Sequence, residues 1–386
     1  MNNNRIDVYD SETVNPNATQ PITLCERFRK RKFMWIVLII IIIVALITTI
    51  SVVVLKTKKT NSEETSTTEE TTTEQSSPSF VIDSNTKWKQ DALTVAGGYD
   101  EGNRTNQLDA PVSVYVDDDN GSIYISDTNN HRIVRWGFNS TNGEVVAGGN
   151  GDGNRTDQLN RPSDTILDKK DSSLIICDCG NHRVVKWSRQ HDTTSQRIII
   201  PHIVCWSLAI DNNGDLYVSD WMKGEVSRWK EEEKTGTKVA SIRRDADSTD
   251  QLQNFVYIFV DEYYSVYVVD YLNGEAIEWK KDAKNGTIVA HGHRHEMKPD
   301  QPPHLIAVTV DSMGNIYVSD TVTCQITRWL PVPGTKFGGT IAGGEGCGKG
   351  SRNLFTPYDL SFDRQGNLYV VDFFNNRVQK FAVEHD

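Results

Sequence analysis

The feature that most constrains this chain is a motif of roughly fifty residues that occurs six times between Ala96 and Phe381. Its two fullest copies begin AGGYDEGNRTNQLDAP and AGGNGDGNRTDQLNRP. Toward its end, each copy has an aspartate and, nine residues later, an aromatic residue. The aspartates, spaced by 51, 42, 50, 50 and 52 residues, are Asp127, Asp178, Asp220, Asp270, Asp320 and Asp372. The aromatic residues that follow them are Trp136, Trp187, Trp229, Trp279, Trp329 and Phe381. A fixed period of this length, with short alternating strands in each unit, indicates a β-propeller or a solenoid.

Each repeat contains four short segments with the pattern of β-strands. In the first repeat they lie at 111–117, 122–127, 131–136 and 143–148. Four antiparallel strands form one propeller blade, and six blades form a ring. The sixth repeat lacks its own fourth strand, whereas the unpaired segment 88–96 matches that strand in sequence. We therefore expect an all-β, six-bladed propeller over 86–386, in which 88–96 completes the last blade and covers its edge.

A single long apolar run precedes the repeats. Residues 33–55 carry no charge over 23 positions, and as a helix they would extend about 35 Å, enough to span a bilayer core of about 30 Å. Because 32 residues precede the run, it predicts an uncleaved anchor and not a signal peptide. Five basic residues lie just before it and three just after it, which favours a cytosolic amino terminus. The expected order is a cytoplasmic tail at 1–32, a transmembrane helix at 33–55 and a stalk at 56–85.

Two further features agree with an extracellular or lumenal location of the repeats. The segment 57–79 is rich in Thr, Ser and Glu, a composition typical of a disordered, O-glycosylated stalk. Five N-glycosylation sequons lie in the repeats, at Asn103, Asn120, Asn139, Asn154 and Asn285. Together with the anchor, they predict a single-pass type II membrane protein of the plasma membrane or the secretory pathway.

The charge distribution argues against nucleic-acid binding. Residues 1–32 contain six basic and four acidic residues, and residues 56–80 contain three basic and five acidic residues. The net charges of these two segments therefore cancel. The repeats therefore hold the whole net charge of −11. An acidic domain lacks the basic surface that a phosphate backbone requires.

Five of the six cysteines lie in the repeats, and in an oxidising compartment they could form two bridges. Cys179 lies in the turn after the second strand of the second repeat, and Cys205 lies at the end of the next connection between repeats. Cys324 and Cys347 occupy the corresponding loops around the fifth and sixth repeats. We expect the bridges Cys179–Cys205 and Cys324–Cys347, with Cys177 left as a buried free thiol.

The repeated pattern resembles the NHL repeat over about 300 of the 386 residues. The turns Asn130-His131-Arg132 and Asn181-His182-Arg183 carry the name-giving residues, and Asn376-Arg377 is a reduced form. Blade three departs from the pattern because it is short and lacks the AGG and QL elements. The resemblance implies a six-bladed propeller whose loops bind ligands. NHL proteins that are ubiquitin ligases also carry paired CxxC units, which are absent from this sequence.

The repeated aspartates and aromatic residues each have two interpretations. Six carboxylates on one face could bind metal, but we favour a structural role in which each accepts hydrogen bonds within its own turn. The aromatic row could stack on sugars, but repetition in every blade favours packing between blades. The turns DDNGS after Asp117 and NNGD after Asp211 resemble fragments of calcium loops, yet both lack the acidic residue that an EF-hand needs at its twelfth position.

Three histidines suggest a rival function. His291, His293 and His295 alternate along the chain, so on a strand their imidazoles would point the same way and could hold zinc or copper. Some NHL propellers are zinc-dependent amidating lyases, so the resemblance makes an extracellular metal-dependent lyase or hydrolase the alternative. We favour a non-enzymatic module without a cofactor that binds an extracellular protein, peptide or glycan or acts in adhesion, because no histidine lies within an inner strand, where a channel-bound metal would be held.

Overall fold

The structure is a computed structural model that describes residues 81–83, 85–188, 196–231, 233–241, 257–292, 304–331 and 336–385. The expected tail, transmembrane helix and most of the stalk lie outside the described residues, as do His293 and His295. Within the described ranges, no helix is long and apolar enough to cross a membrane.

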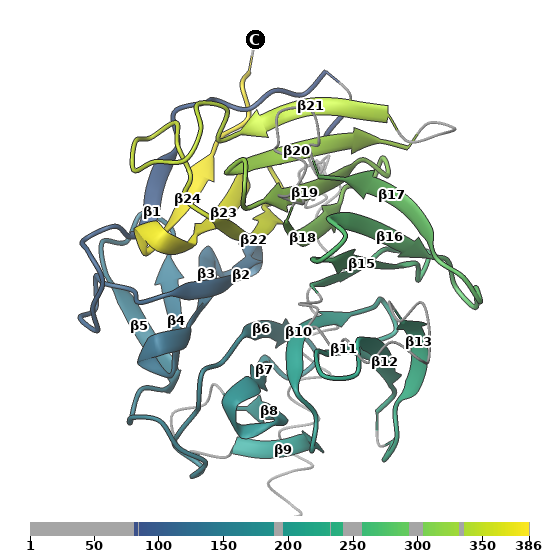
Figure 1. The fold of residues 1–386 in the computed structure, drawn as a ribbon. Coiled ribbons are helices and arrows are strands. Elements are labelled where there is room, and N and C mark those ends of the chain that lie inside the picture. The colour runs from purple at the N-terminus through teal and green to yellow at the C-terminus, as the bar shows by residue number, and fades with distance from the viewer. Residues whose placement is uncertain are drawn as a thin grey trace, which may run out of the picture. The chain divides into compact units, whose positions relative to one another are not determined.

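The fold is a ring of six antiparallel sheets of four strands each (Figure 1). Blade 1 comprises β2 (Pro111–Asp117), β3 (Ser122–Asp127), β4 (Arg132–Gly137) and β5 (Gly143–Gly148). Blade 2 comprises β6 (Asp164–Asp168), β7 (Ser173–Asp178), β8 (Arg183–Trp187) and β9 (Gln196–Pro201). Blade 3 comprises β10 (Cys205–Ile210), β11 (Leu216–Asp220), β12 (Glu225–Trp229) and β13 (Thr237–Ser241). Blade 3 thus keeps all four strands although its sequence departs from the repeat pattern.

The second half of the ring repeats this order. Blade 4 comprises β14 (Ile258–Val260), β15 (Val266–Asp270), β16 (Glu275–Trp279) and β17 (Thr287–His291). Blade 5 comprises β18 (Leu305–Val310), β19 (Ile316–Asp320), β20 (Gln325–Leu330) and β21 (Lys336–Ala342). Blade 6 comprises β22 (Pro357–Phe362), β23 (Leu368–Asp372), β24 (Arg377–Phe381) and β1 (Leu93–Gly97). The first strand of each blade is innermost, and β2 contacts both β6 and β22, which closes the ring.

The segment before the first repeat completes blade 6, as the sequence predicts. β1 pairs antiparallel with β24, and the register runs from Leu93 opposite Lys380 to Gly97 opposite Arg377. Just before β1, Trp88 is 2% exposed, and its indole Nε1 donates a 2.8 Å hydrogen bond to the carbonyl oxygen of Gly366. The first glycine of the AGG motif suits this close pairing, because Gly97 has a φ of +68° and a Cβ there would collide with the carbonyl oxygen of Asn376.

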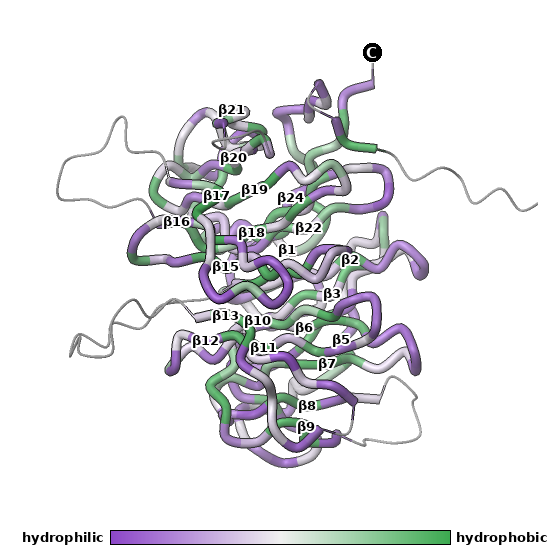
Figure 2. Tube along the Cα trace, turned by 90° about the vertical axis from the view of Figure 1, so that its right-hand side faces the viewer, coloured by the Kyte–Doolittle hydropathy of each residue, from purple (hydrophilic) through white to green (hydrophobic). Residues whose placement is uncertain are grey.

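Hydrophobic side chains fill the spaces between neighbouring blades, and Figure 2 shows apolar strand segments in the interior with polar turns at the edges. Trp187 of blade 2 packs in one cluster with Tyr124 and Ile133 of blade 1. Trp136 of blade 1 packs in another with Tyr369 of blade 6. The repeated aromatic residue therefore joins each of these blades to the preceding one.

The turns divide between two faces of the ring. We call the face with the turn between the first and second strands of each blade the first-turn face. The opposite face, which also carries the connections between blades, is the second-turn face. Short 3-10 helices form several of these turns: η1 (Asp118–Asn120) on the first-turn face, and η2 (Thr128–Asn130), η3 (Cys179–Asn181) and η4 (Phe373–Asn375) on the second-turn face.

Candidate functional site

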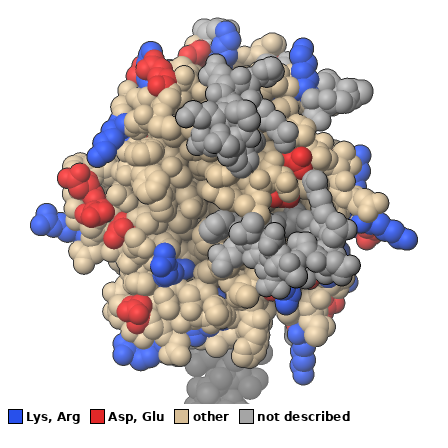
Figure 3. All heavy atoms as spheres, viewed as in Figure 1, with Lys and Arg blue, Asp and Glu red and all other residues tan. Residues whose placement is uncertain are grey.

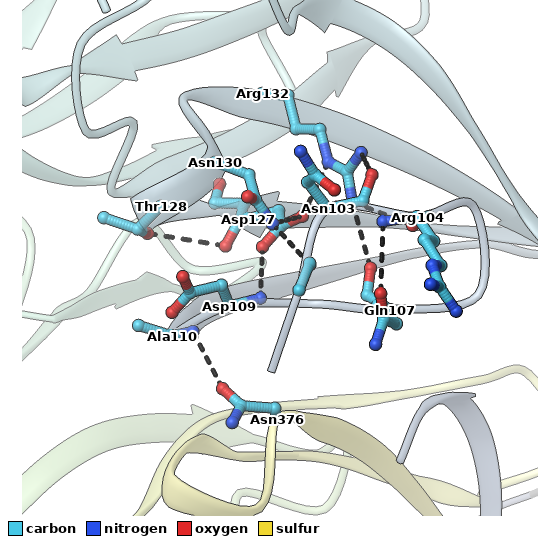
Figure 4. Close-up of polar contacts among 12 residues, drawn as sticks. Asn103, Arg104, Gln107, Asp109, Ala110, Asp127, Thr128, Asn130, Arg132 and Asn376 are labelled. Atoms are coloured by element: carbon cyan, nitrogen blue, oxygen red, sulfur yellow. Dashed lines mark hydrogen bonds and ion pairs between the residues drawn. The ribbon is translucent and has the colours of Figure 1, made fainter. Parts of the chain in front are cut away.

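The repeated aspartate of blade 1 is enclosed by its own turn (Figure 4). The carboxylate of Asp127 accepts hydrogen bonds from the backbone N–H of Asp109 at 2.7 Å, from Asn130 Nδ2 at 2.9 Å and from Arg132 Nε at 2.7 Å. The Arg132 guanidinium also donates to the carbonyl oxygen of Asn103 at 2.7 Å. Burial nevertheless raises the pKa of Asp127 to about 6. Its oxygens are occupied by internal donors, which leaves little capacity for a ligand.

Blades 2 and 6 repeat this network, with Asp178–Arg183 at 2.6 Å and Asp372–Arg377 at 2.7 Å. Blades 3 to 5 differ, because the arginine is replaced by Glu225, Glu275 and Gln325. There the aspartates accept bonds from the turn itself, for example from the backbone N–H of Lys223 to Asp220 at 3.2 Å. The second turns of blades 3 to 5 therefore lack the arginine brace, and the turn of blade 5 is held by the disulfide Cys324–Cys347 instead.

A ring of six equivalent side chains lines the middle of the channel. Each lies in the first strand of its blade or just before that strand, and an aspartate follows it four positions later. The six residues are Ser113, Asp164, Ser207, Tyr257, Ala307 and Asp359. Three of them accept a backbone hydrogen bond from the next blade. Asp164 accepts from Leu208 at 2.8 Å, Ser207 from Ile258 at 3.4 Å and Asp359 from Val114 at 2.9 Å. The repeat pattern marks these positions by the aspartate four residues later, but it does not show that they face the channel.

The two channel carboxylates lie in an unusual electrostatic environment. No ion pair joins Asp164 or Asp359 to a cationic side chain within the described part of the chain. Burial raises the pKa of Asp164 to about 6. Burial and the nearby Asp164 charge raise the pKa of Asp359 well above its ordinary value. A cavity of about 570 Å³ opens from these residues toward the first-turn face, while Tyr257 crosses the channel and donates a 2.6 Å hydrogen bond to the carbonyl oxygen of Val112.

Aromatic rings gather on the second-turn face of blade 6. Phe355 and Phe374 lie 5.1 Å apart between ring centroids, Phe374 and Phe373 4.9 Å apart, and Phe373 stacks on Tyr358 at 4.6 Å. We call these four residues the aromatic strip. Phe374 is 57% and Phe355 40% exposed. Burial raises the pKa of Tyr358 to about 12, and Tyr271 of blade 4 contributes to this shift.

Further aromatic rings continue this surface around the channel mouth. Tyr271 stacks on His304 with ring centroids 4.4 Å apart, and Trp206 and Trp221 of blade 3 lie 6.5 Å apart. All four side chains are half-buried. Figure 3, drawn from the side of η2 to η4, shows charged side chains mainly toward the periphery of this face and few in its uncovered middle.

The histidine cluster is described only at its first member. His291 ends β17, and its Nδ1 lies 4.0 Å from Glu275 Oε1 while its ring lies edge-on to Trp329. Among the described residues, no group of three His, Cys, Asp or Glu side chains is placed to hold a metal ion. In the candidate calcium turn of blade 1, the carboxylate of Asp119 is paired with Lys169 at 2.9 Å and with Arg364.

One predicted disulfide is wrong. Cys205 is bonded to Cys177 and not to Cys179, with Cα atoms 5.5 Å apart. Cys177 lies in β7 and packs in the apolar cluster that contains Cys205, whereas Cys179 begins η3 after the chain has turned away. Cys179 is the free thiol, and burial raises its pKa to about 11. The other bridge, Cys324–Cys347, forms as predicted, with Cα atoms 5.1 Å apart.

All five sequon asparagines are exposed. Asn120, Asn139 and Asn285 lie in turns of the first-turn face, and Asn103 and Asn154 lie in the connections that lead into blades 1 and 2.

Comparisons with known proteins agree with this architecture. The family model described as NHL repeat matches residues 108–136, and no curated protein is significantly similar in sequence. Among solved structures, the chain is similar to a protein of unknown function from Bacteroides thetaiotaomicron, with 16% identity, 76% of each chain covered and a TM-score of 0.57. It is also similar to an auxiliary nutrient binding protein of that organism, with 17% identity, 79% of this chain and 75% of the other covered, and a TM-score of 0.55. A further auxiliary nutrient binding protein, from Bacteroides ovatus, has 14% identity, coverage of 79% and 75%, and a TM-score of 0.53. At such identities these likenesses establish the fold alone.

Proposed function

We propose that this six-bladed NHL-repeat propeller is the extracellular, non-enzymatic binding module of a single-pass type II membrane protein. Its ligand is a protein or peptide that contacts the aromatic strip on the second-turn face. The observation that carries this proposal is the unbroken contact from Phe355 through Phe374 and Phe373 to Tyr358, with the first two rings largely exposed. Aromatic residues are enriched at protein interfaces, where they supply a large apolar area.

The surroundings of the aromatic strip support a docking role. The turns of blades 3 to 5 lack the arginine that braces the turns of blades 1, 2 and 6, so their loops are free to differ in sequence. Where Figure 3 shows described residues, the middle of this face carries few charged side chains, so docking on that part would desolvate few ionic groups. The two similar propellers described as auxiliary nutrient binding proteins share this fold.

The extracellular location rests on different observations. Two disulfides suit an oxidising compartment, and all five sequons are exposed. Expressed in a eukaryotic cell, the full chain should lose apparent mass on glycosidase treatment, and a carboxyl-terminal tag should be reached by antibody on intact cells. A tag protected from antibody, with no change in mass, would contradict this topology.

A binding screen tests the role of the aromatic strip. Cells displaying the full chain would be probed with a library of extracellular proteins and peptides, and each hit would be measured again on the variants Phe374→Ser and Phe355→Ser. We expect affinity to fall by about tenfold or more, because truncating an interface aromatic commonly costs 2 kcal/mol or more. Ile198→Ser is the control, since this apolar side chain is 50% exposed on the outer strand β9 of blade 2. Ligands that tolerate both strip variants, or a screen that yields no protein or peptide ligand, would overturn the proposed site.

A further inference from the structure

One position in the third strand of each blade has the opposite charge in blade 4. The residue before the repeated aromatic is basic in five blades, as Arg135, Lys186, Arg228, Arg328 and Lys380. In blade 4 it is Glu278.

In blades 2, 3 and 6 this basic residue lies beside an acid of the first-turn face of its own blade. Lys186 Nζ lies 2.6 Å from Asp168 Oδ2, and Lys380 Nζ lies 3.2 Å from Asp363 Oδ2. Arg228 Nε lies 3.9 Å from Asp215 Oδ2. These cations balance carboxylates that are at most partly exposed, which would otherwise be costly to desolvate.

Blade 4 has the acids without the cation. The hydroxyl of Tyr267 is within 3.3 Å of Asp261 Oδ2 and 3.4 Å of Glu278 Oε1, so two carboxylates share one donor. Neither carboxylate has an ion pair within the residues that the structure describes. This pair of acids is therefore short of one positive charge relative to blades 2 and 6.

A groove gives access to these acids. A cavity of about 1190 Å³ lies between blades 4 and 5, and its lining includes Asp261, Glu278, Asp311, Phe259 and Pro331. The corresponding space between blades 6 and 1 is about 440 Å³. There the ring of Phe138 stacks on Tyr369 at 6.1 Å.

The difference in volume has a local cause. Phe138 lies two residues after the repeated aromatic of blade 1, and the residue at that position in blade 5 is Pro331. A proline is too short to fill the space that a phenylalanine ring fills. The groove therefore combines apolar walls with uncompensated carboxylates at one side.

We propose that this groove binds the side chain of a lysine or arginine presented by a protein or peptide partner. The cationic head takes the place that the blade's own Lys or Arg takes in blades 2, 3 and 6, and the aliphatic stem lies against Phe259 and Pro331. Lys280 and Lys281 also line the groove. Among the described residues neither lysine is ion-paired with Asp261 or Glu278, and Lys281 lies over the ring of Tyr264 at 4.7 Å. The described residues provide no group of three metal-ligating side chains, so an organic cation suits the groove better than a metal ion. The site is on the first-turn face and does not depend on the aromatic strip.

The test uses the full chain in detergent, with Nα-acetyl-arginine amide and Nα-acetyl-lysine amide as probes. Ligand that binds only the folded protein raises the Tm by mass action. We expect both cations to raise the Tm, whereas the neutral isostere Nα-acetyl-citrulline amide does not. Equal shifts with arginine and citrulline, or no shift with either cation, would overturn the proposal.

Two variants locate the binding. Glu278→Gln keeps a hydrogen-bond acceptor for Tyr267 and should weaken cation binding by about tenfold or more, since it removes one partner of a desolvated charge pair. Glu278→Lys restores the charge found in the other blades, so it should raise the Tm without ligand and abolish the response to arginine. Glu144→Lys makes the same charge change on the exposed strand β5 and should leave the response unchanged. A response that survives both Glu278 variants would place the cation elsewhere and refute the site.

Discussion

The hydroxyl of Tyr257 donates a 2.6 Å hydrogen bond to the carbonyl oxygen of Val112, on the opposite side of the ring. Tyr257 belongs to blade 4 and Val112 to blade 1, so one fully buried side chain spans the channel. The channel side chains Asp164 and Asp359 instead accept hydrogen bonds from their own strand and from an adjacent blade. Tyr257 therefore connects two blades that are not neighbours in the ring.

Replacing Tyr257 with Phe should destabilise the propeller. The change leaves the buried carbonyl of Val112 without its tyrosine donor, and such a loss costs about 1–3 kcal/mol. Urea denaturation would measure it as a lower midpoint with an unchanged m-value. Tyr263→Phe serves as the control, because that ring is 72% exposed. An unchanged midpoint for Tyr257→Phe would mean that the cross-channel bond does not contribute to stability.

The channel carboxylates predict a specific pH dependence of stability. The pKa of Asp164 is raised from 3.8 to about 6, and the pKa of Asp359 is raised as well. The folded protein then binds protons more tightly than the unfolded chain does, so these groups make the free energy of unfolding decrease as pH rises from about 4 through 6. Each group contributes a slope of at most roughly 1.4 kcal/mol per pH unit.

The variant Asp359→Asn tests this dependence. It removes one of the two titrating groups and lowers the pKa of Asp164, so the Tm should vary less with pH between about 4 and 7. Asp157→Asn, on the surface beside Arg155, should retain the parent slope. If Asp359→Asn left the change of Tm with pH unaltered, the channel carboxylates would not be the cause of the pH dependence.

The closing segment of blade 6 should be essential to stability. Trp88→Ala removes a buried indole that packs edge-on against Tyr317, a change that typically costs 3–5 kcal/mol. A chain that begins at Asp100 also loses β1, and it should lose still more of the ~5–15 kcal/mol available to a folded domain. Equal melting temperatures for chains that begin at Ser79 and at Asp100 would contradict this closure.

Peptide mapping under non-reducing conditions should recover Cys177 linked to Cys205. Cys179 should react with an alkylating reagent only after unfolding, because burial raises its pKa to about 11 and limits access. The variant Cys179→Ser should leave the mapped bridge intact. Recovery of a Cys179–Cys205 peptide would restore the pairing expected from sequence.

Replacing His291, His293 and His295 with Ala decides between the binding module and the metal-dependent enzyme. Without a metal, surface replacements should change the free energy of unfolding by no more than about 0.5 kcal/mol. Zinc content of the purified protein, measured before and after chelation, provides the second readout. Stoichiometric zinc that is lost in the triple variant would favour the lyase or hydrolase.

The elements that repeat along the chain could be predicted from sequence, because six copies reveal what each position requires. Asp127 and Trp136 recur at a fixed spacing, and this spacing predicts the blades, the ring and the closing strand. The pairing of Cys205 was missed because Cys177 and Cys179 are only two residues apart. Which of them faces Cys205 depends on where β7 ends and η3 begins.

The candidate sites depend on contacts between blades and were harder to predict. Tyr271 and Tyr358 are 87 positions apart and become neighbours only because the ring brings their blades together around the channel. The channel ring that contains Asp164 and Asp359 could not be predicted from single repeats, because the sequence pattern of a strand does not show which side of the strand lines the channel.

The strand that completes blade 6 also determines how the domain bears tension. A pull on the residues before Trp88, directed along β1, loads the ladder from Leu93 to Gly97 in shear, so that its hydrogen bonds resist together. A pull across the strand would instead open them one at a time. Under such a pull, β1 and Trp88 are the first elements of the ring to bear the load.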